Sequence, residues 1–445
     1  MVENVAVDAQ PSGWARARRV VRDATLTTSS SAVAALCSIL ALALNARSLG
    51  PGDFGTLAVI QAYATFISGL CTFESWQPVI RLCAKSRRRL GPAASSGITL
   101  DISAALFATI VAIGGILLFG EAIGVSRENR LLAAIYSLTL LASLSGTPKG
   151  VLRLDGRYDV IAGNQVAQGA AMVIVSLVLW AVDASLLAYV TVLAAAGAFY
   201  NLTLFVRLLF RARRENIGLF NPLGSRSRRR FFRIFLAMAT GTSLVSTLVG
   251  ARRHVGLFLV ASLLGEVAAG SYSVASRLAT MVSRLTGPLN QVIFPEIARL
   301  SNAEPPDRLF RLNNHVTVLS ACAAGGMTVV AILLQKVVVL LAVGAAYAEA
   351  PQLFAILFAA ECFGLAGMHF NPLIQVLAGT KPLLKILTLA TIVYLPLSLA
   401  LSGWMGISGI AWAGLIVSAA IYAAMAMASR SLLKRRVRMA EGPLV

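Results

Sequence analysis

The sequence predicts an all-α integral membrane protein with twelve transmembrane helices, arranged as two pseudo-symmetric six-helix bundles around a central cavity. Composition is the first reason, because 57% of the 445 residues are hydrophobic and 13% are charged, about half the charged share of a soluble domain. A succession of long apolar segments is the second reason. The third is a motif that occurs twice, at equivalent places in the chain.

Twelve segments have the roughly 20 mostly apolar residues that a helix needs to cross a bilayer. An arginine-rich segment, 1–23, precedes them. It does not have the form of a cleavable signal peptide, because the apolar run after it is too long and lacks a small-residue cleavage site. The predicted helices are near residues 25–47, 55–80, 94–119, 131–152, 159–181, 184–208, 232–263, 269–297, 314–342, 351–377, 382–403 and 408–429.

Basic residues gather in alternate connections between these helices, and the sequence has 39 Lys and Arg against 19 Asp and Glu. Because cytoplasmic loops of membrane proteins carry an excess of Lys and Arg, both termini and every basic connection are predicted to be cytoplasmic. For any one of these residues, setting the topology is the simplest role. The basic segments, besides the N-terminal one, are near residues 81–89, 149–157, 211–233, 299–311, 381–385 and 430–438.

A four-residue motif occurs before the second predicted helix and again before the eighth. Its copies are Leu49, Gly50, Gly55 and Val59 and, 215 residues later, Leu264, Gly265, Gly270 and Val274. A shift of six helices preserves orientation, so the two halves are predicted to be related by an axis along the membrane normal. The predicted divisions are a cytoplasmic lead 1–23, an N-terminal bundle 24–209, a basic cytoplasmic linker 210–230, a C-terminal bundle 231–430 and a cytoplasmic tail 431–445.

The chain lacks the sequence features of the common catalytic and metal sites. It contains no G-x-x-x-x-G-K-[ST] nucleotide loop, and His254, His315 and His369 are isolated from one another. Its five cysteines are far apart, without the spacing of a disulfide framework or a metal site. The predicted exterior connections are also too short to hold an acceptor substrate. We therefore expect no enzyme activity, no metal and no cofactor.

Arginines within the predicted helices are the strongest indication of function. Arg252 and Arg253 precede Leu264 by about eleven residues, which places them about 17 Å inside the exterior end of the seventh helix. Arg277 and Arg284 are seven residues apart on the eighth helix and share a face. Charged side chains at this depth are costly and usually functional. The alternative is that residues 252–254 form a loop between shorter helices.

Few acidic residues in the interior of the predicted spans could pair with these arginines, chiefly Glu74, Asp101 and Glu361. An excess of guanidinium groups predicts an anionic ligand. A phosphate or diphosphate suits arginine, because the planar guanidinium donates two parallel hydrogen bonds to it. The predicted diphosphate-binding residues are Arg81, Arg252, Arg253, Arg277 and Arg284.

Two corresponding helices, the second and the eighth, also carry stripes of polar residues. A shared water-filled cavity would keep such side chains away from lipid. The alternative for the Ser and Thr residues is close helix packing, which small hydroxyl residues commonly mediate. The predicted cavity-lining residues are Gln61, Thr65, Ser68, Thr72, Glu74 and Gln77 on the second helix, and Ser273 and Thr280 on the eighth.

Five short segments give the chain a family resemblance. They are LGPGDFG at 49–55, ESWQPVIR at 74–81, GSYSVA at 270–275, VIFPE at 292–296 and GISGIA at 406–411. In these segments the chain resembles the bacterial polysaccharide flippases, the Wzx-type family of the multidrug/oligosaccharidyl-lipid/polysaccharide exporter superfamily. The resemblance implies two lobes of helices around a cationic cavity.

The resemblance also implies a function. Members of the family are thought to move undecaprenyl-diphosphate-linked oligosaccharides from the cytoplasmic to the periplasmic leaflet, for export of O-antigen, capsule or exopolysaccharide. In such a flippase the diphosphate would meet Arg81 first and the cavity arginines next, and the two halves would rock to change access. Relatives often carry an acidic residue where this chain has Gly256. An ion-coupling role is therefore not carried over to that position, and Glu74 is the remaining candidate.

The expected partners are the lipid-linked oligosaccharide, anionic membrane lipids attracted by the basic segments, and polysaccharide polymerase or assembly proteins, but no nucleic acid. One rival function is a cation-coupled multidrug exporter of the same fold, whose cavity should be acidic or aromatic. Other rivals are a membrane glycan ligase or polymerase, and a scaffold that transports nothing.

Overall fold

The computed structural model describes residues 13–83, 86–214, 226–281, 283 and 306–440. Within these ranges the chain is helical apart from short turns, and no β-strand occurs, which confirms the all-α fold class. The α-helices are α1 Gly13–Cys71, α2 Trp76–Cys83, α3 Leu90–Phe119, α4 Arg130–Ser137, α5 Gly146–Leu154, α6 Tyr158–Ala181, α7 Leu186–Arg214, α8 Arg226–Leu264, α9 Glu266–Ala279, α11 Pro306–Val343, α12 Ala350–Ala366, α13 Phe370–Ala378, α14 Lys381–Met405 and α15 Ile407–Ala440. Short 3-10 turns are η1 Arg87–Arg89, η2 Glu121–Ile123, η3 Arg127–Asn129 and η4 Leu138–Ala142.

Eight helical spans within the described ranges are long and apolar enough to cross a membrane, or nine if α12 and α13, bent by 41°, form one span. α1 covers the first predicted span and most of the second, because its helix continues through a kink at Gly50, and α2 covers the end of the second. Part of the predicted span 269–297 lies outside the described residues. The multi-pass membrane architecture is thus confirmed, whereas the number of twelve helices stays a prediction.

The lateral surface of the helices is apolar. Large hydrophobic side chains are widely exposed, including Leu118 at 75%, Leu341 at 73% and Trp404 at 90%. Extensive exposure of this kind is unfavourable in water, but not against the acyl chains of a bilayer. These residues therefore indicate that lipid surrounds the helices.

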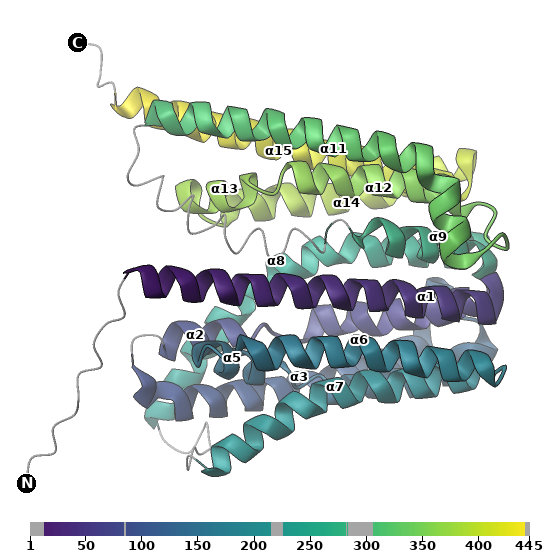
Figure 1. Ribbon diagram of the computed structural model, residues 1–445, viewed down its shortest axis with the longest axis horizontal. Helices are drawn as coiled ribbons and strands as arrows, with labels where there is room; N and C mark the ends of the chain where they lie inside the picture. The colour runs from purple at the N-terminus through teal and green to yellow at the C-terminus, as the bar shows by residue number, and fades with distance from the viewer. Residues whose placement is uncertain (1–12, 84–85, 215–225, 282, 284–305, 441–445) are drawn as a thin grey trace, which may run out of the picture.

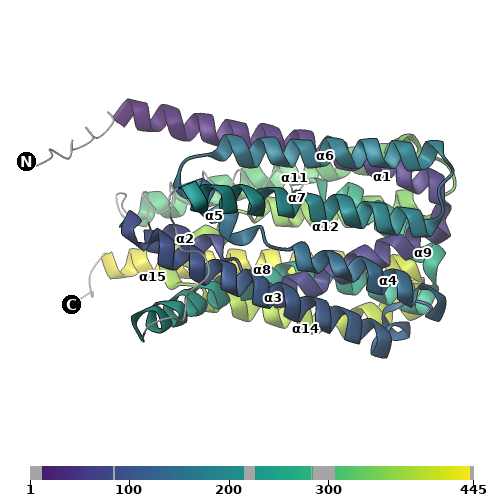
Figure 2. The ribbon, with the colours of Figure 1, turned by 90° about the horizontal axis from the view of Figure 1, so that it is seen from below.

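The helices form two groups that lie side by side, roughly along the long axis of the molecule (Figures 1 and 2). The first helix group contains α1 to α7, and the second contains α9 and α11 to α15. α8 runs obliquely between them and contacts α1, α2 and α3 as well as α9, α14 and α15. The start of α1 and the end of α15 lie at the same end of the molecule, which we call the terminal end. We call the opposite end the turn end.

The first turns of α8 belong to the core of the first helix group. Phe235 and Ala239 of α8 are buried in one cluster with Val79 of α2 and Leu208 of α7. The first helix of the predicted C-terminal bundle therefore begins against the other bundle. Much of the predicted linker between the bundles, 215–225, lies outside the described residues.

The two copies of the repeated motif have the same backbone conformation. Gly50 has φ 70° and ψ 177°, and Gly265 has φ 86° and ψ −179°. This region of φ/ψ space is essentially open to glycine alone, so both turns depend on that residue type. The repeat in the sequence thus corresponds to two equivalent turns, one within α1 and one between α8 and α9.

At the turn end the helix groups meet through a second pair of repeat-related glycines. A β-carbon on Gly55 would overlap the carbonyl oxygen of Glu266, and one on Gly270 would overlap the carbonyl oxygen of Pro51. Because glycine has no β-carbon, α1 and α9 cross here with their backbones in direct contact.

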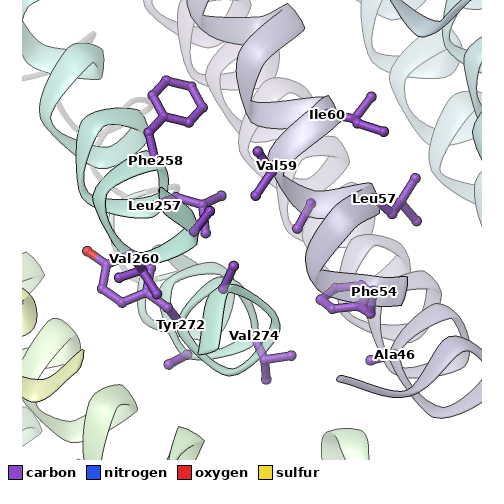
Figure 3. Packing of buried hydrophobic residues seen from close by; sticks show 14 of the residues in the cluster. Ala46, Phe54, Leu57, Val59, Ile60, Leu257, Phe258, Val260, Tyr272 and Val274 are labelled. Carbon is purple, nitrogen blue, oxygen red and sulfur yellow. The ribbon is translucent and has the colours of Figure 1, made fainter. Parts of the chain in front are cut away.

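Apolar side chains fill the space around this crossing (Figure 3). Val59 of α1 and Leu257 of α8 point toward each other, and both belong to a buried cluster that includes Val274 of α9. Tyr347 lies just before α12, and its hydroxyl donates a hydrogen bond of 2.8 Å to the carbonyl oxygen of Ala46 in α1. The two helix groups are therefore tightly joined at the turn end.

Candidate functional site

A cavity of about 640 Å³ lies between the helix groups, lined by residues of α1, α4, α6, α7, α8 and α9. We call it the central cavity. Two of its threonine hydroxyls bond within their own helices, Thr65 to the carbonyl oxygen of Gln61 at 2.7 Å and Thr280 to that of Arg277 at 3.0 Å. The predicted site residues that line it are Gln61, Thr65, Arg253, Ser273, Arg277 and Thr280.

Arg277 of α9 lies in the central cavity and reaches across to the first helix group. Its Nη2 donates a hydrogen bond of 2.8 Å to Oε1 of Gln61 in α1. Its guanidinium carbon is 5.6 Å from the centroid of the Phe54 ring, a distance at which a cation is attracted to an aromatic face. The acceptor that Arg277 reaches across the interface is thus the neutral amide of Gln61.

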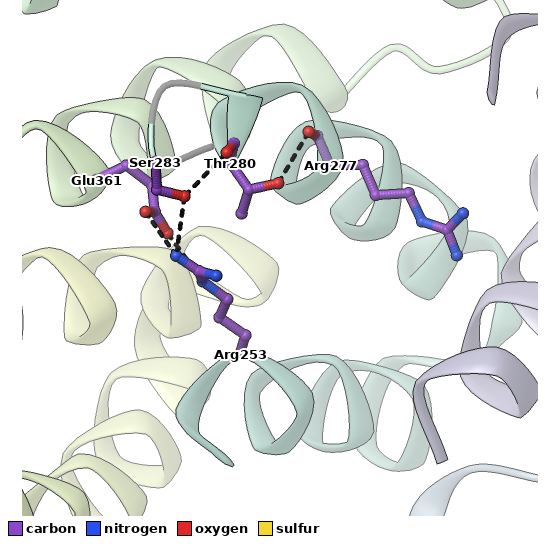
Figure 4. A network of polar contacts seen from close by, with 5 residues as sticks. All are labelled: Arg253, Arg277, Thr280, Ser283 and Glu361. Carbon is purple, nitrogen blue, oxygen red and sulfur yellow. Dashed lines mark hydrogen bonds and ion pairs between the residues drawn. The ribbon is translucent and has the colours of Figure 1, made fainter. Parts of the chain in front are cut away.

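Arg253 of α8 is held differently, because it forms an ion pair with Glu361 of α12 (Figure 4). Nε is 3.0 Å from Oε1 and Nη2 is 2.7 Å from Oε2. Nη2 also donates to the Ser283 hydroxyl at 3.2 Å. The expectation that the cavity arginines lack carboxylate partners is therefore wrong for Arg253, because packing of α12 against the end of α9 brings Glu361 to it.

Residues 252–254 are within the continuous helix α8, Arg226–Leu264. The alternative of a loop between two shorter helices at this position is therefore wrong. A helix keeps its backbone hydrogen bonds paired at membrane depth, and so the arginines can be placed in the interior without exposing the main chain.

A second cavity, of about 300 Å³, is in the second helix group and shares Arg253 with the central cavity. Arg252 lines the second cavity, together with Glu361, Tyr272 and Tyr394. Unlike Arg253, Arg252 does not line the central cavity. The two neighbouring arginines of α8 thus have different surroundings, which their adjacency in the sequence does not reveal.

Gly256 is close to two of these tyrosines. A β-carbon on Gly256 would lie 2.6 Å from the hydroxyl oxygens of both Tyr272 and Tyr394. A larger side chain would have to displace both hydroxyls. This packing gives a physical reason for glycine at the position.

A third cavity, of about 280 Å³, adjoins the central cavity and shares Thr65, Gly250 and His254 with it. Thr72 and Glu74 also line the third cavity, so that three of the predicted polar residues face this smaller space. Oε2 of Glu74 accepts a hydrogen bond of 2.5 Å from Gln77, and the Glu74 backbone N–H donates one of 2.9 Å to the Ser243 hydroxyl.

Three of the predicted residues that the structure describes, Arg81, Ser68 and Gln77, are not brought to these cavities. Arg81 is exposed on α2 and lines none of the three cavities. Ser68 also lines none of them, and its carbonyl oxygen accepts a hydrogen bond of 2.6 Å from the Thr72 hydroxyl. Arg284 lies outside the described residues.

Asp101 serves a local structural purpose. Its carboxylate accepts hydrogen bonds from the Ser75 hydroxyl and from the backbone N–H of Thr147 at 2.9 Å. Ser75 is in the break between α1 and α2, and Thr147 is in the first turn of α5. A carboxylate at a helix N-terminus is favourable, so Asp101 fixes the two broken helices to α3.

Sequence reasoning missed the ring-bearing residues Tyr136, Tyr272 and His254 of the central cavity lining. His254 lies with its ring centroid 6.1 Å from that of Phe66 in α1. A single tyrosine or histidine in an apolar helix gives no indication of whether it faces a cavity or the lipid interface, so no pattern in the sequence identified them.

The chain is similar in sequence to known membrane proteins. The profile of a family described as polysaccharide biosynthesis protein matches residues 20–301. Inner membrane protein YghQ of Escherichia coli (strain K12) is 25% identical over 288 residues, which are 64% of this chain and 81% of that protein.

The fold is similar to those of two kinds of solved transporter. An inward-facing multidrug resistance MATE family transporter of the MOP superfamily has a TM-score of 0.72 at 14% identity, over 95% of this chain and 100% of that chain. The lipid II flippase MurJ, in an inward closed conformation, has a TM-score of 0.69 at 13% identity, over 94% of this chain and 90% of that chain. At such low identity the likeness shows a shared fold.

Proposed function

Since the chain belongs to the polysaccharide biosynthesis protein family, we propose that it moves a polyprenyl-diphosphate-linked oligosaccharide from the cytoplasmic to the periplasmic leaflet of the inner membrane. Family membership confirms the resemblance found in the sequence. Together with the fold, it groups the chain with the transporters and flippases of the MOP superfamily. The cargo, its direction and the mechanism are our proposal.

The main support for this proposal is the positive charge of the central cavity lining. Arg253 and Arg277 line the cavity, and none of the described residues that line it is acidic. Such a cavity attracts the negative charges of a diphosphate, and guanidinium groups bind its oxygens through paired hydrogen bonds. Neutral polar groups of the same lining, such as Gln61 and Gln168, offer hydrogen bonds to the glycan.

A multidrug exporter of the same fold is the rival function, and the likeness to a MATE transporter favours it. A cationic drug would meet like charge at Arg253 and Arg277 in the central cavity. Juxtaposed like charges are strongly unfavourable, so the charge of the cavity favours an anionic cargo.

The proposed route begins at the terminal end of the molecule. We assign this end to the cytoplasm because arginines cluster at the end of α7, the start of α8 and the end of α15. These arginines would also attract anionic lipids, by about 1 kcal/mol each, and this face is where we expect contact with glycan assembly proteins. The headgroup would pass through the third cavity into the central cavity while the polyprenyl chain stays in lipid.

The proposed mechanism is alternating access, in which the helix groups rock about the cavity. The crossing of α1 and α9 at Gly55 and Gly270 would separate to open the turn end toward the periplasm. No covalent bond is made or broken in this movement, and so we propose a transporter without enzyme activity.

The test is substitution of Arg277 in a strain whose surface glycan depends on this protein. Arg277→Gln and Arg277→Glu are expected to reduce surface glycan about tenfold or more, since a hydrogen bond to a charged group contributes about 1.5–3 kcal/mol. The protein should still accumulate in the membrane, and the lipid-linked precursor should build up.

Arg127→Gln is the matched control for this test. Arg127 is 82% exposed, its Nε donates to Glu121 nearby in the chain at 2.7 Å, and it lines none of the three cavities. Normal surface glycan in cells with Arg277→Glu would refute the proposed cargo site.

A further inference from the structure

Two consecutive arginines of α8, Arg252 and Arg253, lie near the same carboxylate, that of Glu361. Arg253 forms both hydrogen bonds to Glu361. Arg252 lines the second cavity beside Glu361 and is close enough to interact electrostatically with it. Among the residues that the structure describes, the Arg252 guanidinium forms no hydrogen bond or ion pair. Glu361 thus has one bonded partner and a second cation nearby.

Three residues line both the central and the second cavity, Arg253, Tyr272 and Ser276, and of these only Arg253 is charged. Its side chain is 45% exposed, against 17% for that of Glu361. The guanidinium is therefore accessible to a ligand in the central cavity, while the carboxylate is largely covered. In Figure 4, Arg277 extends away from the Arg253–Glu361 pair, so the two cavity arginines are held by separate partners.

We propose that, when a diphosphate binds, Arg252 replaces Arg253 as the ion-pair partner of Glu361. Arg253 is then released to bind the cargo. The inference rests on the proposed function, because the diphosphate is the group that competes with Glu361 for Arg253. If Arg252 were absent, releasing Arg253 would leave a covered carboxylate unpaired, which is strongly unfavourable. With Arg252 present, the Glu361 carboxylate has an arginine partner both before and after the exchange.

The exchange requires side-chain rotation and no change in the helix. Consecutive residues of an α-helix point about 100° apart, so Arg252 and Arg253 approach Glu361 from neighbouring directions on α8. Arginine side chains are long and flexible enough to change partner within one cavity. Arg252 is therefore a positioning residue, which acts on the cargo through Glu361 and Arg253.

The test measures binding of farnesyl diphosphate to the purified full-length protein in detergent, by isothermal titration calorimetry. Arg252→Gln is expected to weaken binding about fivefold or more, at the lower end of the range for coupled sites, although Arg252 does not line the central cavity. Glu361→Gln is expected to tighten binding about fivefold or more, because Arg253 is then free of its competitor.

The double variant Arg252→Gln/Glu361→Gln distinguishes the exchange from two independent effects. Without the carboxylate, Arg252 has nothing to take over, so the double variant is expected to bind like Glu361→Gln alone. Farnesol, which lacks the diphosphate, should show none of these differences. Additive effects of the two substitutions would overturn the exchange.

Arg277→Gln separates failure of this inference from failure of the proposed function. If Arg277→Gln weakens binding but Arg252→Gln does not, the exchange is wrong and the diphosphate site stands. If Arg277→Gln binds like the unmodified protein, the proposed function fails and the exchange fails with it. Should Arg252→Gln not accumulate, Glu361→Gln decides, because unchanged or weaker binding in that variant would overturn the exchange.

Discussion

Two repeat-related helices, the part of α1 after Gly50 and α9 after Gly265, have the same frame but different chemistry. Both begin at a glycine with the same unusual backbone conformation, and both line the central cavity. α1 presents the neutral Gln61 to the cavity, whereas α9 presents Arg277. Among the described lining residues, the arginines come from α8 and α9 alone.

The difference between the two helices indicates that the repeat determines the turn and the helix crossing, but not the charge of the side chains that face the cavity. A cation in place of Gln61 would repel Arg277, because the two side chains are in contact. A neutral amide on α1 avoids this repulsion and accepts the hydrogen bond of Arg277. Charge on one helix of the repeat-related pair is thus compatible with the anion site that we propose and with close packing of the two helices.

Disrupting the close crossing of α1 and α9 should have the largest effect. Gly55→Val is expected to abolish transport, because the new side chain would overlap the Glu266 carbonyl oxygen. Overpacking costs about 1–3 kcal/mol where side chains can adjust, and backbone atoms adjust less. Surface glycan measures the effect, and Gly270→Val should behave in the same way.

Gly114→Val is the control for the helix crossing, since no other atoms lie within 4 Å of a β-carbon placed on Gly114. It should leave surface glycan unchanged. Normal glycan with Gly55→Val would mean that transport does not need the close contact of α1 and α9.

Placing a negative charge on the cavity face of α1 should have a smaller effect. Gln61→Glu is expected to weaken binding of farnesyl diphosphate about tenfold, because the new carboxylate would pair with Arg277 and compete with the ligand at about 1.5–3 kcal/mol. Gln61→Leu is the matched variant, which removes the acceptor without adding charge and should bind at least as well as the unmodified protein. Equal binding by both variants would contradict the role assigned to a neutral partner.

Testing the equivalence of the two turns should give the smallest effect. Gly50→Ala and Gly265→Ala are each expected to lower the stability of the folded protein by about 1–3 kcal/mol, since alanine is strained in this region of φ/ψ space. Thermal unfolding in detergent measures the change. Gly69→Ala, in a helical part of α1 with open space around it, should be neutral or stabilising. Clearly unequal losses at Gly50 and Gly265 would show that the turns are not equivalent.

The sequence predicted many helices closely, because lipid requires long apolar runs. The predicted span 382–403 corresponds to α14, Lys381–Met405, and the span 159–181 to α6, Tyr158–Ala181. It did not predict the breaks within three other spans, such as that between α12 and α13. Breaks depend on partners in other helices, as Asp101 of α3 shows by accepting a hydrogen bond from the start of α5.

The sequence alone determined the glycines of the repeat and the polar stripes and predicted a membrane depth for the arginines, because hydropathy and helical periodicity are local properties. Only the tertiary structure decided what each polar group meets. Glu361 is 108 residues from Arg253, and Gln61 is 216 residues from Arg277. Periodicity gives the residues that share a helix face, but the rotation and neighbours of each helix come from packing. For that reason the sequence indicated a charged interior, and the structure separated a paired arginine from one that a neutral amide holds.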